Sequence, residues 1–211
     1  MGTATAVPAD QRAPELGVLE AMQHATDELL HRHETNVGLI THLLATALGL
    51  DETVAAEMSY AGSLHDVGRR AIADDLFSKV GPLNRRDAEE ICRHTGEGAL
   101  LLERSGFDPE GLAVQAALFH HERHDGTGYP VGLAGEAIPL VARIVAVADV
   151  YDAIRAERPY KPAIGHAEAC RIMLEGDDRC RPGHFDPAVL AAFRDNAEAI
   201  RRVWGEPAPR V

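Results

Sequence analysis

Histidines and aspartates recur at the ends of the apolar segments of this sequence or inside them. The set comprises His33, His65, Asp66, His94, His120, His121 and Asp149. Imidazole and carboxylate ligands together suit iron, manganese or zinc, whereas calcium and magnesium sites consist mostly of oxygen ligands. We therefore predict a transition-metal site whose ligands come from distant parts of the chain.

Two pairs of neighbouring residues stand out, His65 with Asp66 and His120 with His121. Successive side chains on a helix diverge by about 100°, so the two members of a pair cannot readily point the same way. Each pair could span two metal positions or occupy two edges of one. Asp66 is the natural bridge, because a carboxylate has two oxygens that can each bind a metal.

Each of these residues also has a plain structural interpretation. A lone helical histidine such as His24 or His42 is usually solvated or hydrogen-bonded within the protein. The combination of these residues favours metal binding, because Asp149 stands inside the apolar run IVAVADVYDA, where an unpaired charge is costly to bury. The sequence contains no HExxH, which argues against a zinc protease of that class.

The elements that must position these residues are helical, and we predict an all-α fold. Asp51, Asn84 and Asp108 are expected as helix N-caps, with Pro109 at a first helical position. The segment 138–157 is β-branched in its middle, but its length and alanine-rich ends favour a buried helix. The expected helical segments are 16–33 with its continuation 36–50, then 52–68, 85–104, 108–123, 138–157, 165–176 and 186–204.

The chain is expected to form one domain, 16–205, between a flexible leader, 1–15, and a frayed tail, 206–211. Its 45% hydrophobic and 26% charged residues are typical of a soluble globular protein. No apolar run approaches the roughly 18 to 20 residues of a membrane-spanning helix, and the N-terminus lacks the basic flank and apolar stretch of an export signal. We expect a cytoplasmic protein with no membrane contact.

The formal net charge of −12 argues against binding to nucleic acid polymers, which normally requires a basic stripe. A small phosphate-bearing ligand remains compatible with this charge if metal ions or a few local cations supply a positive field. The three cysteines have no CxxC spacing, so we predict neither a disulfide framework nor a thiolate zinc site.

Four motifs carry a resemblance to a known family. LHDVG (64–68), RHT (93–95), HHERHDGTGYP (120–130) and ADVYDAIRAERPYK (148–161) resemble the HD-GYP family of bacterial cyclic di-GMP phosphodiesterases, a branch of the HD metallohydrolase superfamily. The resemblance runs from about residue 20 to about residue 195, with the motifs in the family's order and spacing. It implies a single HD-type helical bundle that hydrolyses cyclic di-GMP to pGpG, with slower onward cleavage to GMP.

The resemblance also implies a centre of two divalent metal ions, with Fe or Mn expected. His33 would be the first ligand, and His65 with Asp66 the signature dyad, in which Asp66 bridges the metals. Asp149 would be the late aspartate on the first metal. The shell of the second metal would be completed by His94, His120 and His121.

Substrate contacts follow from the same resemblance. Gly128, Tyr129 and Pro130 would form the lip of the substrate cleft, although DGTGYP alone could be a tight helix-exit turn. Arg158 and Lys161 stand where family members place cations that hold phosphates. Two positions, Arg69 and Leu29, depart from the family's pattern. Arg69 replaces the lysine of HDxGK, which preserves the charge for phosphate contact but makes proton donation less favourable, and Leu29 replaces a glutamate that some members use for a third metal.

Two alternatives remain open from the sequence. The chain could be a weakly active or inactive module that binds a cyclic dinucleotide or docks a partner such as a diguanylate cyclase or a response regulator. It could also hydrolyse another cyclic dinucleotide, because a fold alone does not determine a substrate. The native metal, the oligomeric state and the regulatory input are not determined by these patterns.

Overall fold

The structure is a computed structural model that describes residues 28–73, 76, 79, 84–156, 163–178 and 180–205. Every regular element in these ranges is helical, which confirms the predicted all-α class. The expected leader and tail, as well as Arg158 and Lys161, lie outside the described residues. In the described part of the chain, no helix is both long and apolar enough to cross a lipid bilayer.

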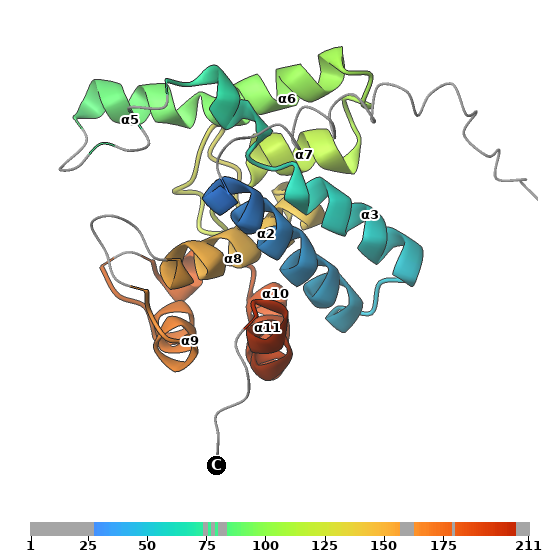
Figure 1. Cartoon of the computed structure of the whole chain (residues 1–211), viewed down its shortest axis with the longest axis vertical. Coiled ribbons are helices and arrows are strands. Elements are labelled where there is room, and N and C mark those ends of the chain that lie inside the picture. The colour runs from blue at the N-terminus through green and yellow to red at the C-terminus, as the bar shows by residue number, and fades with distance from the viewer. Residues whose placement is uncertain are drawn as a thin grey trace, which may run out of the picture.

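The helices pack in layers around a central pair, α2 and α8 (Figure 1). Helix α3 packs beside α2, the group α5 to α7 lies on one side of this pair, and α9 to α11 lie on the other. The α-helices are α2 (Glu28–Ala47), α3 (Glu52–Ser63), α5 (Arg85–Cys92), α6 (His94–Arg104), α7 (Leu112–Phe119), α8 (Leu140–Arg155), α9 (His166–Glu175), α10 (Pro187–Asp195) and α11 (Ala197–Val203). The short 3₁₀ helices are η2 (Val67–Ala71), η3 (Gly135–Ala137) and η4 (Pro182–His184).

Helix α8 forms the middle of the core. Twelve of its 16 residues are buried, so it has no polar face of the kind that a surface helix shows. This confirms that the β-branched segment is a buried helix. The same helix carries Asp149, Asp152 and Arg155 into the interior, where each charged group needs a polar partner.

Two of the three predicted helix caps are confirmed. The Asp51 carboxylate accepts a hydrogen bond from the Val54 N–H at 3.0 Å. Asn84 forms a reciprocal capping box with Asp87 at the start of α5. The prediction for Asp108 and Pro109 is wrong, because Asp108 accepts from the N–H of Glu110 in a local turn and α7 begins only at Leu112.

The predicted helix 85–104 is interrupted at Arg93, between α5 and α6. Side chains compete there for the backbone carbonyls of the helix. The ring Nδ1 of His94 bonds to the carbonyl of Ile91 at 2.7 Å, and the Thr95 hydroxyl donates to the carbonyl of Cys92 at 3.1 Å. The predicted helix 186–204 is likewise divided, at Asn196, into α10 and α11.

The predicted helices 52–68 and 108–123 both end early, at Ser63 and Phe119. Both neighbouring pairs, His65–Asp66 and His120–His121, therefore lie just beyond a helix end. Tertiary packing forces the first of these ends. A Cβ atom on Gly68 would lie 2.0 Å from the carbonyl oxygen of His94, so the chain leaves α3 and crosses α6 in a tight turn.

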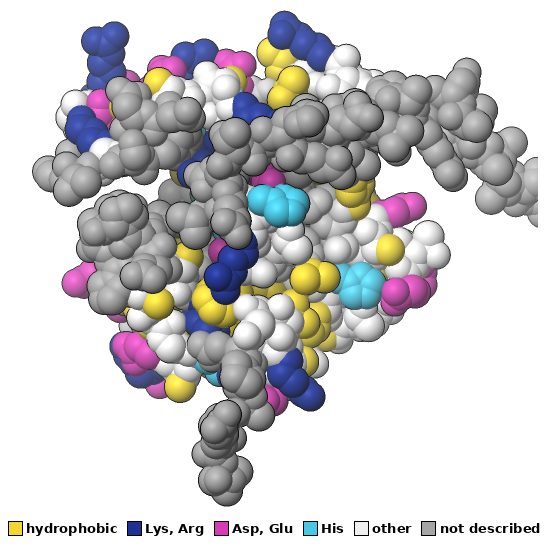
Figure 2. Space-filling view, viewed as in Figure 1, with side chains coloured by type: hydrophobic (Ala, Val, Ile, Leu, Met, Phe, Trp, Pro, Cys, Tyr) yellow, Lys and Arg dark blue, Asp and Glu magenta, His cyan; other side chains and the backbone are white. Residues whose placement is uncertain are grey.

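The surface carries charges of both signs. On the face in Figure 2, the Lys and Arg side chains of the described residues stand at separate points among acidic and uncharged groups. A continuous basic stripe is not seen on that part of the surface. This distribution agrees with the net charge of −12.

Candidate metal centre

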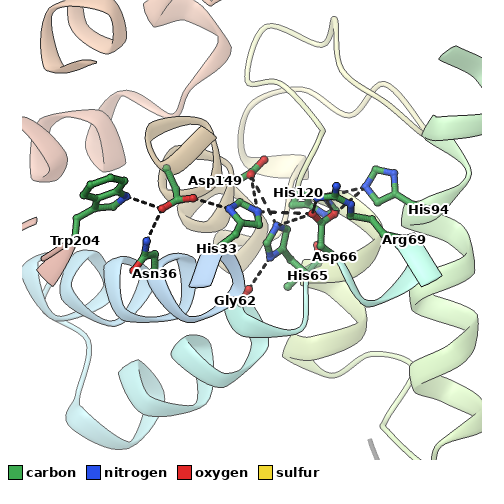
Figure 3. A network of polar contacts seen from close by, with 12 residues as sticks. His33, Asn36, Gly62, His65, Asp66, Arg69, His94, His120, Asp149 and Trp204 are labelled. Carbon is green, nitrogen blue, oxygen red and sulfur yellow. Dashed lines mark hydrogen bonds and ion pairs between the residues drawn. The ribbon is translucent and has the colours of Figure 1, made fainter. Parts of the chain in front are cut away.

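The structure brings all seven predicted ligand residues to one place between the central helices. His33 comes from α2 and Asp149 from α8, while the remaining residues come from the ends of α3, α6 and α7. Figure 3 shows His33, His65, Asp66, His94, His120 and Asp149 grouped together. His121 joins them, because its ring centroid lies 4.1 Å from that of His120.

Asp66 lies at the middle of this group, and its two oxygens face different histidines. Its Oδ2 lies 3.7 Å from Nε2 of His33 and 3.6 Å from Nε2 of His65. Its Oδ1 lies 3.3 Å from Nε2 of His94 and 3.7 Å from Nε2 of His120. One carboxylate thus connects two sets of imidazoles.

These two sets are each compact enough to hold a cation. The candidate ligand atoms within each set lie within 4.8 Å of one another. We call them the His33 group (His33, His65, Asp66) and the His94 group (His94, His120, His121). Asp149 adjoins the His33 group, because its Oδ1 lies 3.4 Å from Nε2 of His33 and 3.8 Å from Nε2 of His65.

Backbone carbonyls determine which ring nitrogens face the centre. In His65, His94 and His120, Nδ1 lies 2.7 to 3.0 Å from a carbonyl oxygen of the preceding turn. A carbonyl only accepts hydrogen bonds, so Nδ1 carries the proton in each neutral ring. The Nε2 lone pair of each ring is then directed at the centre, as ligation of a metal requires.

The lone pairs in this arrangement suit a cation. The Nε2 atoms of His94 and His120 are 3.2 Å apart, and two lone pairs at that distance repel unless a positive charge lies between them. The buried Nε2 of His65 has no hydrogen-bond partner among the described residues. The donor set therefore fits a metal ion better than it fits a self-contained hydrogen-bond network.

Burial keeps most of these rings uncharged. It lowers the pKa of His65, lowers that of His120 well below its ordinary value and lowers that of His121 to about 4. These histidines are therefore neutral near pH 7, which is the state that binds metals.

His33 differs from these three histidines. Burial alone would lower its pKa, but hydrogen bonds to Asp152 and Asp66 and the charge of Asp149 outweigh that effect and raise the pKa to about 10. Without a bound cation, the His33 imidazolium compensates the nearby carboxylates. Metal binding at this position must displace that proton.

Asp152 is an important residue that the sequence reasoning missed. Its Oδ2 accepts from Nδ1 of His33 at 2.7 Å, and its Oδ1 accepts from Nδ2 of Asn36 at 2.8 Å and from Nε1 of Trp204 at 2.6 Å. A carboxylate behind a ligand histidine orients its ring and raises its basicity. The sequence could have revealed it, because Asp152 is a second aspartate three residues after Asp149, on the same side of one buried helix.

Arg69 stands at the edge of the centre. Its Nη1 donates to Oδ2 of Asp66 at 2.9 Å, and its side chain is 30% exposed. The guanidinium thus connects the buried carboxylate with the solvent. Burial alone would raise the pKa of Asp66, but the contact with the His33 imidazolium and the charge of Arg69 hold it well below the usual range.

The Gly128–Tyr129–Pro130 loop packs directly on the segment that carries His121. A Cβ atom on Gly128 would lie 2.3 Å from the backbone nitrogen of Arg123, so only glycine permits this approach. The half-buried Tyr129 ring lies 4.8 Å from the His121 ring, with 31° between their planes. Pro130 is exposed.

Glu122 anchors this loop and was also missed by the sequence reasoning. Its buried carboxylate accepts from the backbone N–H groups of Val131, Gly132 and Leu133 at 2.7 to 3.1 Å. A residue next to the ligand pair His120–His121 thereby holds the loop. In the sequence, only its position immediately after two histidines in HHERHDGTGYP pointed to a role at the site.

Glu34 is a buried carboxyl group beside the centre. Both of its side-chain oxygens lack a hydrogen-bond partner among the described residues. Burial raises its pKa to about 7, even though the charge of Arg70 acts in the opposite direction. The charges of Asp66 and His33 also act on this carboxyl group, so it adds a weakly acidic group beside the His33 group.

Known proteins are similar to this chain in sequence. A family model described as HD domain matches residues 17–189. The cyclic di-GMP phosphodiesterase PA4108 of Pseudomonas aeruginosa is 43% identical over 168 residues, which cover 80% of this chain and 39% of that protein. The 3'3'-cGAMP-specific phosphodiesterase 2 of Vibrio cholerae is 40% identical over 158 residues, which cover 75% of this chain and 30% of that protein.

A solved structure shares the fold. Bd1817, an HDG"Y"P protein from Bdellovibrio bacteriovorus, superposes with a TM-score of 0.65 at 21% sequence identity. The match covers 89% of this chain and 62% of that one. The chain spans less than half the length of the two phosphodiesterases above.

Proposed function

Because the chain belongs to the HD domain family, we propose that its histidine and aspartate centre hydrolyses a cyclic dinucleotide, with cyclic di-GMP as the substrate and pGpG as the product. Slower cleavage of pGpG to GMP would follow. The observation that carries this proposal is the position of Asp66, whose two oxygens face the His33 group and the His94 group. The similarity to a protein named as a cyclic di-GMP phosphodiesterase supports the choice of substrate.

We infer that the centre holds two divalent cations, Fe or Mn. The mixed nitrogen and oxygen donors suit these metals. His33, His65 and Asp149 would hold one cation and the His94 group the other, with Asp66 shared. When bound, a pair of such cations neutralises the charge of the phosphoryl group and supplies an activated water near neutral pH.

The side chains around the centre have separate roles in this proposal. The Arg69 guanidinium donates hydrogen bonds to a phosphate oxygen at the mouth, and an arginine there is a less favourable proton donor than the lysine of the family motif. Asp66 and Asp149 orient the attacking water. The Gly128–Pro130 loop, held by Glu122, forms the lip of the cleft, and Arg158 and Lys161 hold phosphates.

A second substrate is favoured by one of the comparisons. The similarity to a 3'3'-cGAMP-specific phosphodiesterase is nearly as high as that to PA4108. The two substrates differ in one nucleobase, so the residues that contact a phosphate serve both equally. Discrimination between them would therefore depend on contacts to the bases.

The test is a turnover assay on protein purified without oxygen, with its metal content measured by elemental analysis. Cyclic di-GMP, 3'3'-cGAMP and cyclic di-AMP are supplied in parallel to the wild type, to Asp66→Ala and to the control Asp195→Ala. Asp195 is paired with Arg194 on the surface, 62% exposed, and suits a matched substitution. We expect linear dinucleotide from the wild type and the control, and none from Asp66→Ala.

The other outcomes are also informative. Metal-loaded wild type that binds cyclic di-GMP tightly without forming product would overturn the proposed hydrolysis. It would favour a receptor, or a module whose lip docks a diguanylate cyclase or a response regulator. Faster turnover of 3'3'-cGAMP than of cyclic di-GMP would assign the second substrate.

A further inference from the structure

Helix α11 contributes no predicted ligand, yet one of its flanking residues reaches the candidate metal centre through a single carboxylate. Trp204 donates from Nε1 to Oδ1 of Asp152 at 2.6 Å. The other oxygen of Asp152 accepts from Nδ1 of His33 at 2.7 Å. The line Trp204–Asp152–His33 therefore runs from the end of α11 to the first candidate ligand. Figure 3 labels Trp204 and His33, the two ends of this line.

We propose that Trp204 is a positioning residue for the metal centre. It holds the Asp152 carboxylate in the one orientation that presents Nε2 of His33 to a cation. This inference rests on the proposed metal centre. The sequence motifs around the ligands do not include Trp204, and it stands 52 positions after Asp152.

The orientation of the Asp152 carboxylate depends on its hydrogen-bond partners. The terminal torsion of aspartate is broad, so a carboxylate held by one partner can turn. Oδ1 of Asp152 is held by two donors, Trp204 and Asn36, which come from opposite ends of the chain. With Oδ1 occupied, Oδ2 remains directed at His33, so a proton is kept on Nδ1 and Nε2 faces the centre.

Trp204 is itself held in place by two arginine side chains that lie over its ring. The Cζ atom of Arg155 lies 4.0 Å from the centroid of its ring, and that of Arg32 lies 4.9 Å from it. Arg155 is only 1% exposed, so its attraction to the ring is weakly screened by water. The indole is therefore a fixed donor instead of a mobile surface group.

A purely structural role for Trp204 makes a different prediction from a positioning role. Loss of packing would weaken metal binding at both groups or at neither. Loss of the hydrogen bond to Asp152 would weaken binding at the His33 group alone. Trp204→Phe separates these cases, because it keeps an aromatic ring against Arg155 and removes the N–H.

The experiment is equilibrium dialysis of the metal-free chain against Mn²⁺, with bound metal measured by elemental analysis. It compares the wild type, Trp204→Phe and Asn36→Leu. His33→Ala marks the binding step that belongs to the His33 group. The matched control is Arg202→Ala on α11, since that exposed side chain bonds to the carbonyl of Glu198 at 3.4 Å.

We expect the step lost in His33→Ala to be weakened about 10- to 100-fold in Trp204→Phe, the range for groups that orient a ligand histidine. The other step, and both steps of Arg202→Ala, should match the wild type. As Trp204 is the only tryptophan, quenching of its fluorescence by Mn²⁺ should follow the same step in the wild type.

Three outcomes are decisive. Unchanged binding by folded Trp204→Phe, or equal weakening of both steps, would overturn the positioning role while leaving the metal centre intact. Wild type that binds no Mn²⁺ would instead overturn the metal centre. If Trp204→Phe does not fold, Asn36→Leu decides by the same criterion, because it removes the other donor to Oδ1 of Asp152.

Discussion

The Oδ1 atom of Asp66 lies 3.3 Å from Nε2 of His94, across the junction between η2 and α6. Gly68 makes this approach possible, because its lack of a side chain lets the turn after Asp66 lie directly on the α6 backbone. The central carboxylate of the site thus depends on a glycine two residues away.

Replacing the shared carboxylate should remove activity and metal together. In Asp66→Asn, the side chain retains its shape but loses the negative charge between the two histidine groups. We expect turnover to fall at least about 100-fold, because removing a ligand should cost no less than removing a group that merely orients one. Elemental analysis should find less metal per chain, whereas Asp195→Asn should match the wild type. Full metal content with normal turnover would exclude Asp66 as the shared ligand.

Changes at Arg69 should act on substrate binding. In Arg69→Met, we expect KM to rise about 10- to 100-fold, the equivalent of a charge-assisted hydrogen bond of about 1.5–3 kcal/mol. Arg69→Lys should lie between Arg69→Met and the wild type. Steady-state kinetics on the preferred cyclic dinucleotide measure this effect. The control is Arg85→Met, because the exposed Arg85 side chain pairs with Glu89 on the surface. A fall in kcat alone would place Arg69 in the chemical step and contradict the role in binding.

An added methyl group at Gly128 should displace the loop. The new Cβ would lie 2.5 Å from Cα of Glu122, and overpacking of this kind costs about 1–3 kcal/mol. We expect Gly128→Ala to lower both the stability and the turnover, measured by urea unfolding and by the phosphodiesterase assay. Gly96→Ala is the control, since a Cβ there meets no atom within 4 Å. Equal stability of the two variants would disprove the close packing at Gly128.

Hydrogen exchange can test the anchoring of the loop by Glu122. In Glu122→Gln, one carboxylate oxygen becomes an NH₂ group that cannot accept from the backbone. We expect the amides of Val131, Gly132 and Leu133 to exchange at least about 10-fold faster, because bonds to a charged acceptor contribute about 1.5–3 kcal/mol each. The amide of Thr127, bonded to the Asp125 side chain, should not change. Unaltered exchange at all four amides would show that Glu122 does not hold the loop.

The ion pair between Arg143 and Asp186 should make the free energy of unfolding decrease as the pH falls into the acid range. The same carboxylate caps α10 by accepting from the N–H of Ala188 at 2.7 Å. Burial would raise the pKa of Asp186, but the bonds from Arg143 and from two backbone N–H groups outweigh it and lower the pKa. A lowered pKa means that the stabilisation is present above the unfolded value of about 3.9 and is lost as pH falls through the folded value.

Urea unfolding of metal-free protein between pH 3 and pH 7 checks this expectation. Asp186→Asn should be less stable than the wild type by about 3 kcal/mol at pH 7, because it leaves the Arg143 guanidinium without its ionic partner. The difference should shrink below about pH 4. A difference that stays constant over this range would show that the Asp186 charge does not contribute.

The helices and the residue types of the candidate ligands could be predicted from the sequence because both are encoded locally. Apolar spacing identified the helical segments, Asp51 and Asn84 identified two helix starts, and the apolar run around Asp149 identified the buried helix α8. Each of these features depends on residues within a few turns of one another. The resemblance to a known family then supplied the order of the ligands, which local patterns do not contain.

Only the tertiary structure decided where the helices end and which groups stand behind the ligands. The end of α3 at Ser63 depends on the contact of Gly68 with α6, and the break at Arg93 depends on side chains that take backbone carbonyls. Asp152 gains its role from Trp204, which is distant in the chain and adjacent in space. Periodicity records which face of a helix is buried, but the partner that meets that face is determined by how the helices pack.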